Sequence, residues 1–146
     1  MPTVTTRADL HRIAKAYLEA WMSHRPEAIA RFHAEDAIAD SPMYSTLRGR
    51  KAIEDAARAF MTSFADSTQT IDAIIIDPPQ LALFTTFTAT HVNEFFGLPG
   101  TGRRIEMKVS RHLKVNDDGL FVYERRIYDF TGVLVQIGVL RAKPAT

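Results

Sequence analysis

Side chains that can transfer protons or carry charge gather on one face of a β-hairpin predicted in the second half of the chain. If the Asp-Asp dipeptide between its strands is a two-residue turn, Glu106 lies opposite Asp129, and His112 shares their face. The strand from Glu106 to His112 extends about 20 Å, so His112 is expected to lie far from Asp129. Lys108 and His91 are the closer neighbours. Such a cluster could exchange protons with a ligand, or it could be a solvated or dimer-facing surface.

Helices are predicted in the first half of the chain. Apolar residues recur at intervals of three and four across residues 10–22, which favours an amphipathic helix capped by Thr5 or Thr6. Pro26 fits the first turn of a short second helix. Residues 51–64 repeat the helical period. Each of the longer helices therefore has an apolar face that must be covered.

Strands are predicted from Thr68 onward, where the period changes to two and β-branched and aromatic residues accumulate. They are expected at residues 70–76, 81–94, 104–115 and 120–130, after a short strand at 37–40. The glycines and proline of residues 97–102 indicate a turn between two strands. Strands joined in this way form an antiparallel meander, with the preceding helices on one face. We predict one α+β domain over residues 1–146.

Composition excludes several classes of function. A net charge of +1 and a pI near 8.1 give no field that implies nucleic acid or an anionic membrane as partner. The absence of cysteine excludes disulfides, thiol catalysis and cysteine-based zinc sites. No apolar run approaches a signal peptide or the roughly 20 residues that span a bilayer. A cytoplasmic protein is expected.

Several motifs resemble those of a known family. They are FHAEDAIADSP, the loop HxxEFFGLPGTGRR, an Asp-Gly turn and the tail D-x6-Q-I-G. Over about residues 9 to 140 the chain resembles the SnoaL-like polyketide cyclases, or ester cyclases, of the nuclear-transport-factor and ketosteroid-isomerase superfamily. The resemblance implies a cone-shaped barrel, in which a strongly bent antiparallel sheet wraps around N-terminal helices and encloses an apolar cavity. It also implies a homodimer formed through the sheet.

The resemblance further implies a site for intramolecular aldol chemistry without metal or cofactor. In those cyclases an aspartate is the acid/base and a strand histidine assists it; Asp129 and His112 are the best matches here. The ligand would be a small hydrophobic or aromatic carbonyl compound. Further residues expected to shape the cavity or bind the substrate are Tyr17, Trp21, His33, Asp40, Tyr44, His91 and Lys108.

Related enzymes of this superfamily match less well. Ketosteroid isomerases have an aspartate directly before proline, whereas Ser41 precedes Pro42 here and Asp40 is displaced by one residue. A shift of one residue in an extended segment turns the side chain to the other face, so isomerase chemistry is disfavoured. Limonene-epoxide hydrolases use an Arg-x-Asp pair on one strand, which Arg111-His112-Leu113 lacks.

Alternatives remain open for individual residues and for the whole protein. Asp129 could simply cap a turn, His33 could make a structural hydrogen bond, and Trp21 could be core. A metal site gathered from His33, Asp40 and His91 is disfavoured. The protein could be a cyclase-type enzyme, a noncatalytic protein that binds a small ligand, or an assembly module. An enzyme should bury Asp129 in a pocket; a binder should have an apolar pocket without a convergent carboxylate.

Overall fold

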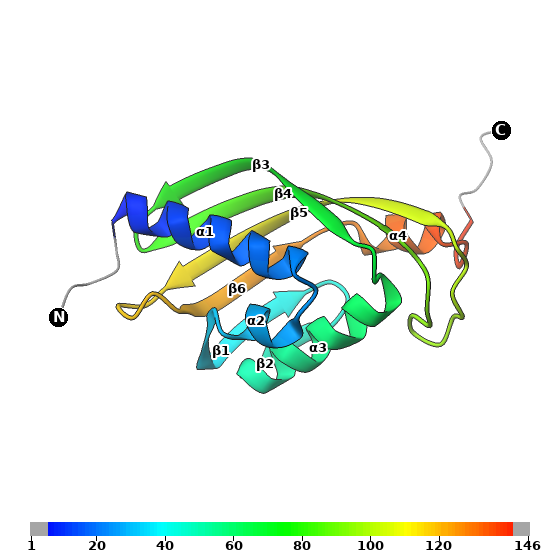
Figure 1. Ribbon diagram of the computed structural model, residues 1–146, viewed down its shortest axis with the longest axis horizontal. Coiled ribbons are helices and arrows are strands. Elements are labelled where there is room, and N and C mark those ends of the chain that lie inside the picture. Colours follow the sequence, from blue (N-terminus) through cyan, green and yellow to red (C-terminus); the bar gives the residue numbers. More distant parts are fainter. Residues whose placement is uncertain (1–5, 142–146) are drawn as a thin grey trace.

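The computed structural model describes residues 6–141, which form a curved six-stranded sheet with helices against one face (Figure 1). The helices are α1 (Arg7–Met22), α2 (Pro26–Ala30), α3 (Arg50–Ser63) and α4 (Phe130–Gln136). The strands are β1 (His33–Ser41), β2 (Ser45–Arg48), β3 (Thr68–Asp77), β4 (Gln80–Thr90), β5 (Arg104–Val115) and β6 (Phe121–Ile127). No helix within residues 6–141 is long and apolar enough to cross a membrane.

Helix α1 forms where the apolar period predicted it. The side chain of Thr6 accepts a hydrogen bond from the backbone N–H of Asp9 at 3.1 Å, which satisfies one of the free donors of the first turn. Thr5, the other candidate cap, lies outside the described residues. The buried side of the helix carries Tyr17 and Trp21, which therefore face the sheet.

The sheet is mixed, not wholly antiparallel as predicted. Its strand order is β2-β1-β6-β5-β4-β3, and β1 pairs with β6 in parallel, while the other neighbours are antiparallel. The chain leaves the β1–β2 hairpin through α3, which lies on the helical face, and resumes at the far edge with β3 (Figure 1). The following meander then brings β6 beside β1 in the same direction. Turn signals predict neighbours in sequence, so they did not show this pairing.

The β5–β6 hairpin differs from the predicted register by two residues. Ser110 lies opposite Ile127 and His112 opposite Arg125, so the expected pair of Glu106 and Asp129 does not form. The cause is a longer turn: the side chain of Asn116 accepts hydrogen bonds from backbone N–H groups of the turn, and β6 begins only at Phe121. A two-residue shift preserves the faces, so Ser110 and His112 still share one side of the sheet.

The last predicted strand, residues 120–130, ends early. β6 stops at Ile127, and Asp129 is the N-cap of α4, where its carboxylate accepts a 2.8 Å hydrogen bond from the N–H of Gly132. The alternative that Asp129 caps a turn is therefore confirmed. Strand β4 likewise ends at Thr90, short of the predicted residue 94.

The loop between β4 and β5 is the turn that its glycines predicted. His91 and Gly102 pair across its base, the backbone N–H of Gly102 donating to the His91 carbonyl at 2.9 Å. A Cβ at Gly100 would overlap the carbonyl of Val92, so only glycine fits there. The N–H of Val92 donates in turn to the Ser63 carbonyl at the end of α3, at 2.9 Å. This loop is thereby fastened to the helical layer.

Candidate functional site

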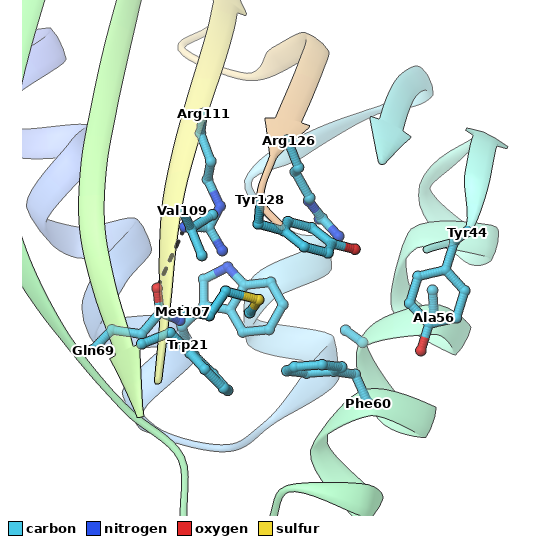
Figure 2. Close-up of a pocket in the computed structure, with 12 residues that line it drawn as sticks. Trp21, Tyr44, Ala56, Phe60, Gln69, Met107, Val109, Arg111, Arg126 and Tyr128 are labelled. Atoms are coloured by element: carbon cyan, nitrogen blue, oxygen red, sulfur yellow. Dashed lines mark hydrogen bonds between the residues drawn. The ribbon is translucent and has the colours of Figure 1, made fainter. Parts of the chain in front are cut away.

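A narrow cavity lies between the inner face of the sheet and helices α1 and α3 (Figure 2). Its volume is about 30 Å³. A water needs roughly 10–15 Å³ by the same kind of measure, so this space takes only about two or three waters as it stands. The lining residues are Trp21, Tyr44, Ala56, Ala57, Phe60, Gln69, Phe87, Met107, Val109, Arg111, Arg126 and Tyr128.

The cavity walls follow from local structure. On β5 alternate residues point inward, so Met107, Val109 and Arg111 line the cavity in sequence. Trp21, near the end of α1, lies against them, and Phe60 approaches from α3 (Figure 2). Most of the wall is thus aromatic or aliphatic, and the charged groups are confined to the end formed by β5 and β6.

Glu124 is the centre of a buried ionic cluster at that end. It is 0% exposed and accepts hydrogen bonds from the Tyr17 hydroxyl at 2.6 Å and from Arg126 Nη2 at 2.9 Å. Two further groups lie close to the same carboxylate. Arg111 Nε is 3.5 Å from Glu124 Oε1, and His33 Nε2 is 3.1 Å from Glu124 Oε2. One carboxylate is therefore shared by two guanidinium groups.

His33 is held between two oxygen atoms. Its Nδ1 lies 3.2 Å from the backbone carbonyl of Ile29, and its Nε2 faces the Glu124 carboxylate. A carbonyl and a carboxylate both only accept hydrogen bonds. Because the carboxylate can only accept, the hydrogen bond between His33 and Glu124 is one in which Nε2 donates, so His33 is a structural donor to Glu124.

Burial and the neighbouring charges act in opposite directions on the pKa of Glu124. Burial alone would raise the pKa of Glu124, but Arg126, His33 and Arg111 outweigh it and hold that pKa well below its ordinary value of 4.5. Burial, together with the negative charge of Glu124, raises the pKa of Tyr17, so its hydroxyl remains a donor. Glu124 is thus an ionised anchor and a poor proton acceptor.

Three buried donors at the cavity have no hydrogen-bond partner among the described residues. They are Trp21 Nε1, Arg111 Nε and Arg126 Nε. The two guanidinium groups also lie over the Trp21 ring, with their Cζ atoms 5.3 and 5.5 Å from a ring centroid (Figure 2). Unpaired buried donors are unfavourable unless something accepts from them.

The lining offers no general base of ordinary strength. None of the cavity-lining residues is Asp, Glu or His. Burial raises the pKa of Tyr44 to about 12, and it also raises the pKa of Tyr128. The arrangement can bind and polarise an oxygen atom, and any proton acceptor has to be a water molecule or a group of the ligand.

The two residues expected to be catalytic lie outside this cavity. Asp129 is exposed and caps α4, which corrects the expectation that it lies in a pocket. His112 is on the opposite, outer face of the sheet, with Nε2 2.8 Å from Gln80 Oε1. Arg111, which directly precedes His112 on β5, lines the cavity instead, because alternate strand residues point to opposite sides of the sheet.

Two expected binding residues are also on the outer side. Lys108 is exposed and donates to the Thr86 hydroxyl at 2.8 Å. Asp40 accepts hydrogen bonds from the hydroxyls of Thr46 and Tyr123, at 2.7 and 3.2 Å. Neither residue reaches the cavity, so their predicted contact with a cavity ligand is not supported by their positions.

The remaining expected residues lie on the helical side of the sheet. Trp21 and Tyr44 line the cavity, and Tyr17 and His33 lie behind it as partners of Glu124. His91 is buried beneath the β4–β5 loop, where its Nδ1 is 3.0 Å from the Thr101 hydroxyl; it does not line the cavity. Residues 6–141 contain no group of His, Cys, Asp and Glu side chains placed to hold a metal.

Arg111, Glu124 and Arg126 were not recognised from the sequence. A signal was present for Arg111, which lies between the apolar residues Val109 and Leu113 on one face of the predicted strand. A charged residue at such a position is buried only when it is paired or serves a site. The predicted cluster of charged residues lies on the opposite, outer face of the hairpin from these three residues.

The helices and the curved six-stranded sheet form an α+β cone of the ketosteroid-isomerase-like fold. Residues 11–137 match the family described as SnoaL-like polyketide cyclase. The chain therefore belongs to the SnoaL-like polyketide cyclase family, and the resemblance seen in its motifs is confirmed.

Solved structures share this fold. AclR from Streptomyces galilaeus, a proposed hydroxylase, is 22% identical with a TM-score of 0.83, over 95% of this chain and 87% of that one. IdmH from Streptomyces antibioticus, a proposed polyketide cyclase, is 26% identical with a TM-score of 0.75, over 88% and 97%. A protein of Catenulispora acidiphila with a ketosteroid isomerase-like fold, in complex with trimethylamine, is 16% identical with a TM-score of 0.75, over 86% and 92%.

The comparison with curated proteins gives no match. The solved structures above carry different descriptions on one fold, so the fold alone does not select a reaction.

Proposed function

We propose that the protein is an enzyme of the polyketide-cyclase type that acts on a small hydrophobic carbonyl compound. The observation that carries this proposal is the set of unpaired buried donors, on Trp21, Arg111 and Arg126, at one end of an aromatic cavity. A carbonyl oxygen placed there would accept hydrogen bonds from groups that otherwise have no partner. The hydrocarbon part of the substrate would lie between Phe60, Tyr128 and the other apolar walls.

The chemistry would be enolisation followed by ring closure. The guanidinium groups of Arg111 and Arg126 stabilise the negative charge that develops on the carbonyl oxygen, in a site from which bulk water is largely excluded. The proton of the α-carbon passes to a water molecule beside the substrate, because no lining residue is a carboxylate or an imidazole. The enolate carbon then attacks a second carbonyl of the same molecule, forming a C–C bond, and the resulting alkoxide takes a proton from water.

The cavity must widen to admit such a substrate. Its present 30 Å³ is far smaller than a ligand of ten or more atoms. Tyr44, on the turn between β1 and β2, lines the cavity and contacts Phe96 of the β4–β5 loop, with ring centroids 5.7 Å apart. Phe96 is 61% exposed, so this pair is the element that we expect to move when a ligand enters.

Exchange of α-protons tests the enolisation step without the natural substrate. In D2O, the wild-type protein should accelerate deuterium incorporation into 2-tetralone, followed by proton NMR. Arg111→Gln removes one oxyanion donor and should reduce the acceleration about 10²- to 10³-fold. Arg125→Gln is the matched control, because Arg125 lies beside Arg126 in sequence but is exposed. Equal acceleration by wild type and Arg111→Gln would reject the proposed role of the donors.

A noncatalytic function is the second candidate. It is favoured by two observations: no carboxylate lines the cavity, as expected for a binding protein, and Asp129 is exposed, whereas the enzyme hypothesis with Asp129 as acid/base required it to be buried in a pocket. Such a protein would bind 2-tetralone, seen as a change in Trp21 fluorescence, without accelerating exchange. Binding with no exchange would therefore select this candidate over the enzyme.

A homodimer through the sheet belongs to the same proposal. Ile75 and Ile127 lie on the outer face and are 61% and 53% exposed. Ile75 is in the same cross-strand row as His112, and Ile127 is the direct partner of Ser110 on β5. Large exposed aliphatic side chains on a sheet face favour burial against a partner. Sedimentation equilibrium should give a dimer for the wild type and a monomer for Ile127→Lys; a wild-type monomer would reject the pairing.

A further inference from the structure

The charges of the buried cluster do not balance. Arg111 and Arg126 each carry a positive charge, and Glu124 is their shared carboxylate. His33, which donates to the same carboxylate, adds no negative charge, and Tyr17 is a neutral donor. At least one positive charge is therefore left without a counter-charge in the interior. Buried charges are ordinarily paired, because removing an ion from water is strongly unfavourable.

Arg111 is the cation without a full partner. Arg126 makes a 2.9 Å hydrogen bond to Glu124, whereas Arg111 Nε lies 3.5 Å from that carboxylate and makes no hydrogen bond to it. The hydrogen bonds that Arg111 does donate are long, at 3.3 Å to Gln69 and 3.5 Å to Thr85, and both acceptors are neutral. The Arg111 side chain is only 5% exposed and lines the cavity.

We infer that the ligand of this cavity is a hydrophobic monoanion, a free carboxylate rather than an ester or amide, and that Arg111 pairs with it. A carboxylate would supply both the missing negative charge and acceptors for the unpaired N–H groups. The aromatic walls and the stacked Trp21 ring suit a flat hydrocarbon attached to that carboxylate. This inference rests on the proposed function in taking the cavity as the ligand site; for an anionic ligand it assigns Arg111 to the carboxylate, and it leaves Trp21 and Arg126 as the donors to the reacting carbonyl oxygen.

A matched pair of probes separates charge from shape. 2-Naphthoate and 2-naphthamide have the same rings, but only the first is an anion at pH 7. Binding is followed by the fluorescence of Trp21, which is the only tryptophan of the chain. Because hydrogen bonds to charged groups are stronger than neutral ones, the wild type should bind the naphthoate about 10- to 100-fold more tightly.

Substitution of Arg111 tests whether this residue causes the preference for 2-naphthoate over 2-naphthamide. Arg111→Gln should lose the preference for the anion while retaining its affinity for the amide, and Arg111→Lys, which keeps the charge, should preserve part of it. Arg125→Gln, on the exposed side of β6, should bind both probes as the wild type does.

Each outcome has a distinct meaning. Equal affinity of the wild type for both probes overturns the inference of an anionic ligand and leaves the proposed function standing. A preference that survives in Arg111→Gln overturns the assignment to Arg111. Binding of neither probe, by folded wild-type protein, contradicts the use of the cavity as a ligand site and so removes both proposals. The wild-type comparison stands even if a variant does not fold.

Discussion

Replacement of Glu124 by glutamine is the perturbation that most directly tests the buried cluster. Glu124→Gln keeps the size of the side chain but removes the negative charge between Arg111 and Arg126. The amide nitrogen would also face a donor, because Tyr17, Arg126 and His33 all approach the present carboxylate within 2.6 to 3.1 Å. The variant therefore combines two uncompensated cations with at least one clash between donors.

The loss of stability expected for Glu124→Gln follows from the burial of this side chain. Glu124 is 0% exposed, so water cannot replace the lost charge. Removing one partner of a buried ion pair typically costs about 3–5 kcal/mol of the free energy of unfolding. We expect Glu124→Gln to lose an amount in this range, while Glu124→Gln/Arg126→Gln should lose less than the sum of the single variants, because the second change removes one of the stranded charges.

Urea denaturation followed by circular dichroism measures these changes. Glu106→Gln is the matched control: Glu106 is exposed on the same sheet, and its contact with Lys108 is 3.6 Å long, so its loss should be barely measurable. The folded-state pKa of Glu124 is depressed, so its ionisation stabilises the fold above pH 4.5, and this contribution is lost as pH falls towards the folded pKa. A Glu124→Gln variant as stable as the wild type at pH 7 would refute the shared-carboxylate description.

Other changes test single contacts. Burial raises the pKa of Tyr44 to about 12. The neutral Tyr44 hydroxyl therefore contributes fully to the free energy of unfolding below pH 10, and this contribution is lost between pH 10 and 12. Over that range the wild type should lose more stability than Tyr44→Phe, measured by the same urea denaturation. Asp129→Ala removes the cap of α4 and should lower the free energy of unfolding by about 1 kcal/mol. Asp129→Asn keeps an acceptor, so it should leave both the stability and the deuterium exchange into 2-tetralone nearly unchanged. Loss of exchange in Asp129→Asn would contradict the site described here. Gly100→Ala should destabilise the protein by about 1–3 kcal/mol in the same denaturation assay, since its Cβ would overlap the Val92 carbonyl; an unchanged midpoint would contradict that packing.

Local patterns predicted most elements, since periods of 3.6 and 2 are set by neighbouring residues. Helix α1, the β4–β5 loop and strand β5, predicted as 104–115, were found where expected. The parallel pairing of β1 with β6 was not foreseen, because residues far apart in sequence meet there. Helix α4 was not predicted: the expected strand ran to residue 130, past the end of β6 at Ile127, and the residues after it were assigned to no element.

The candidate site was less predictable than the fold. The faces of strand β5 were predicted correctly, but the reactive residues were predicted among Glu106, Lys108 and Asp129, which are charged and exposed. The buried cluster depends on which helices cover the inner face. Only the packing of Tyr17 and His33 against Glu124 shows that a carboxylate at that position is satisfied.

The central claim is that a ligand binds beside Trp21 with its oxygen atoms at the buried arginines. The most direct measurement is the indole N–H resonance in a ¹⁵N-¹H correlation spectrum, because the chain has one tryptophan and its Nε1 lacks a partner within residues 6–141. On titration with 2-naphthoate, this resonance should shift and saturate, and the Nε–H resonance of Arg111 should shift with it. A saturable shift confined to outer-face residues such as His112, with the indole resonance unmoved, would contradict the claim.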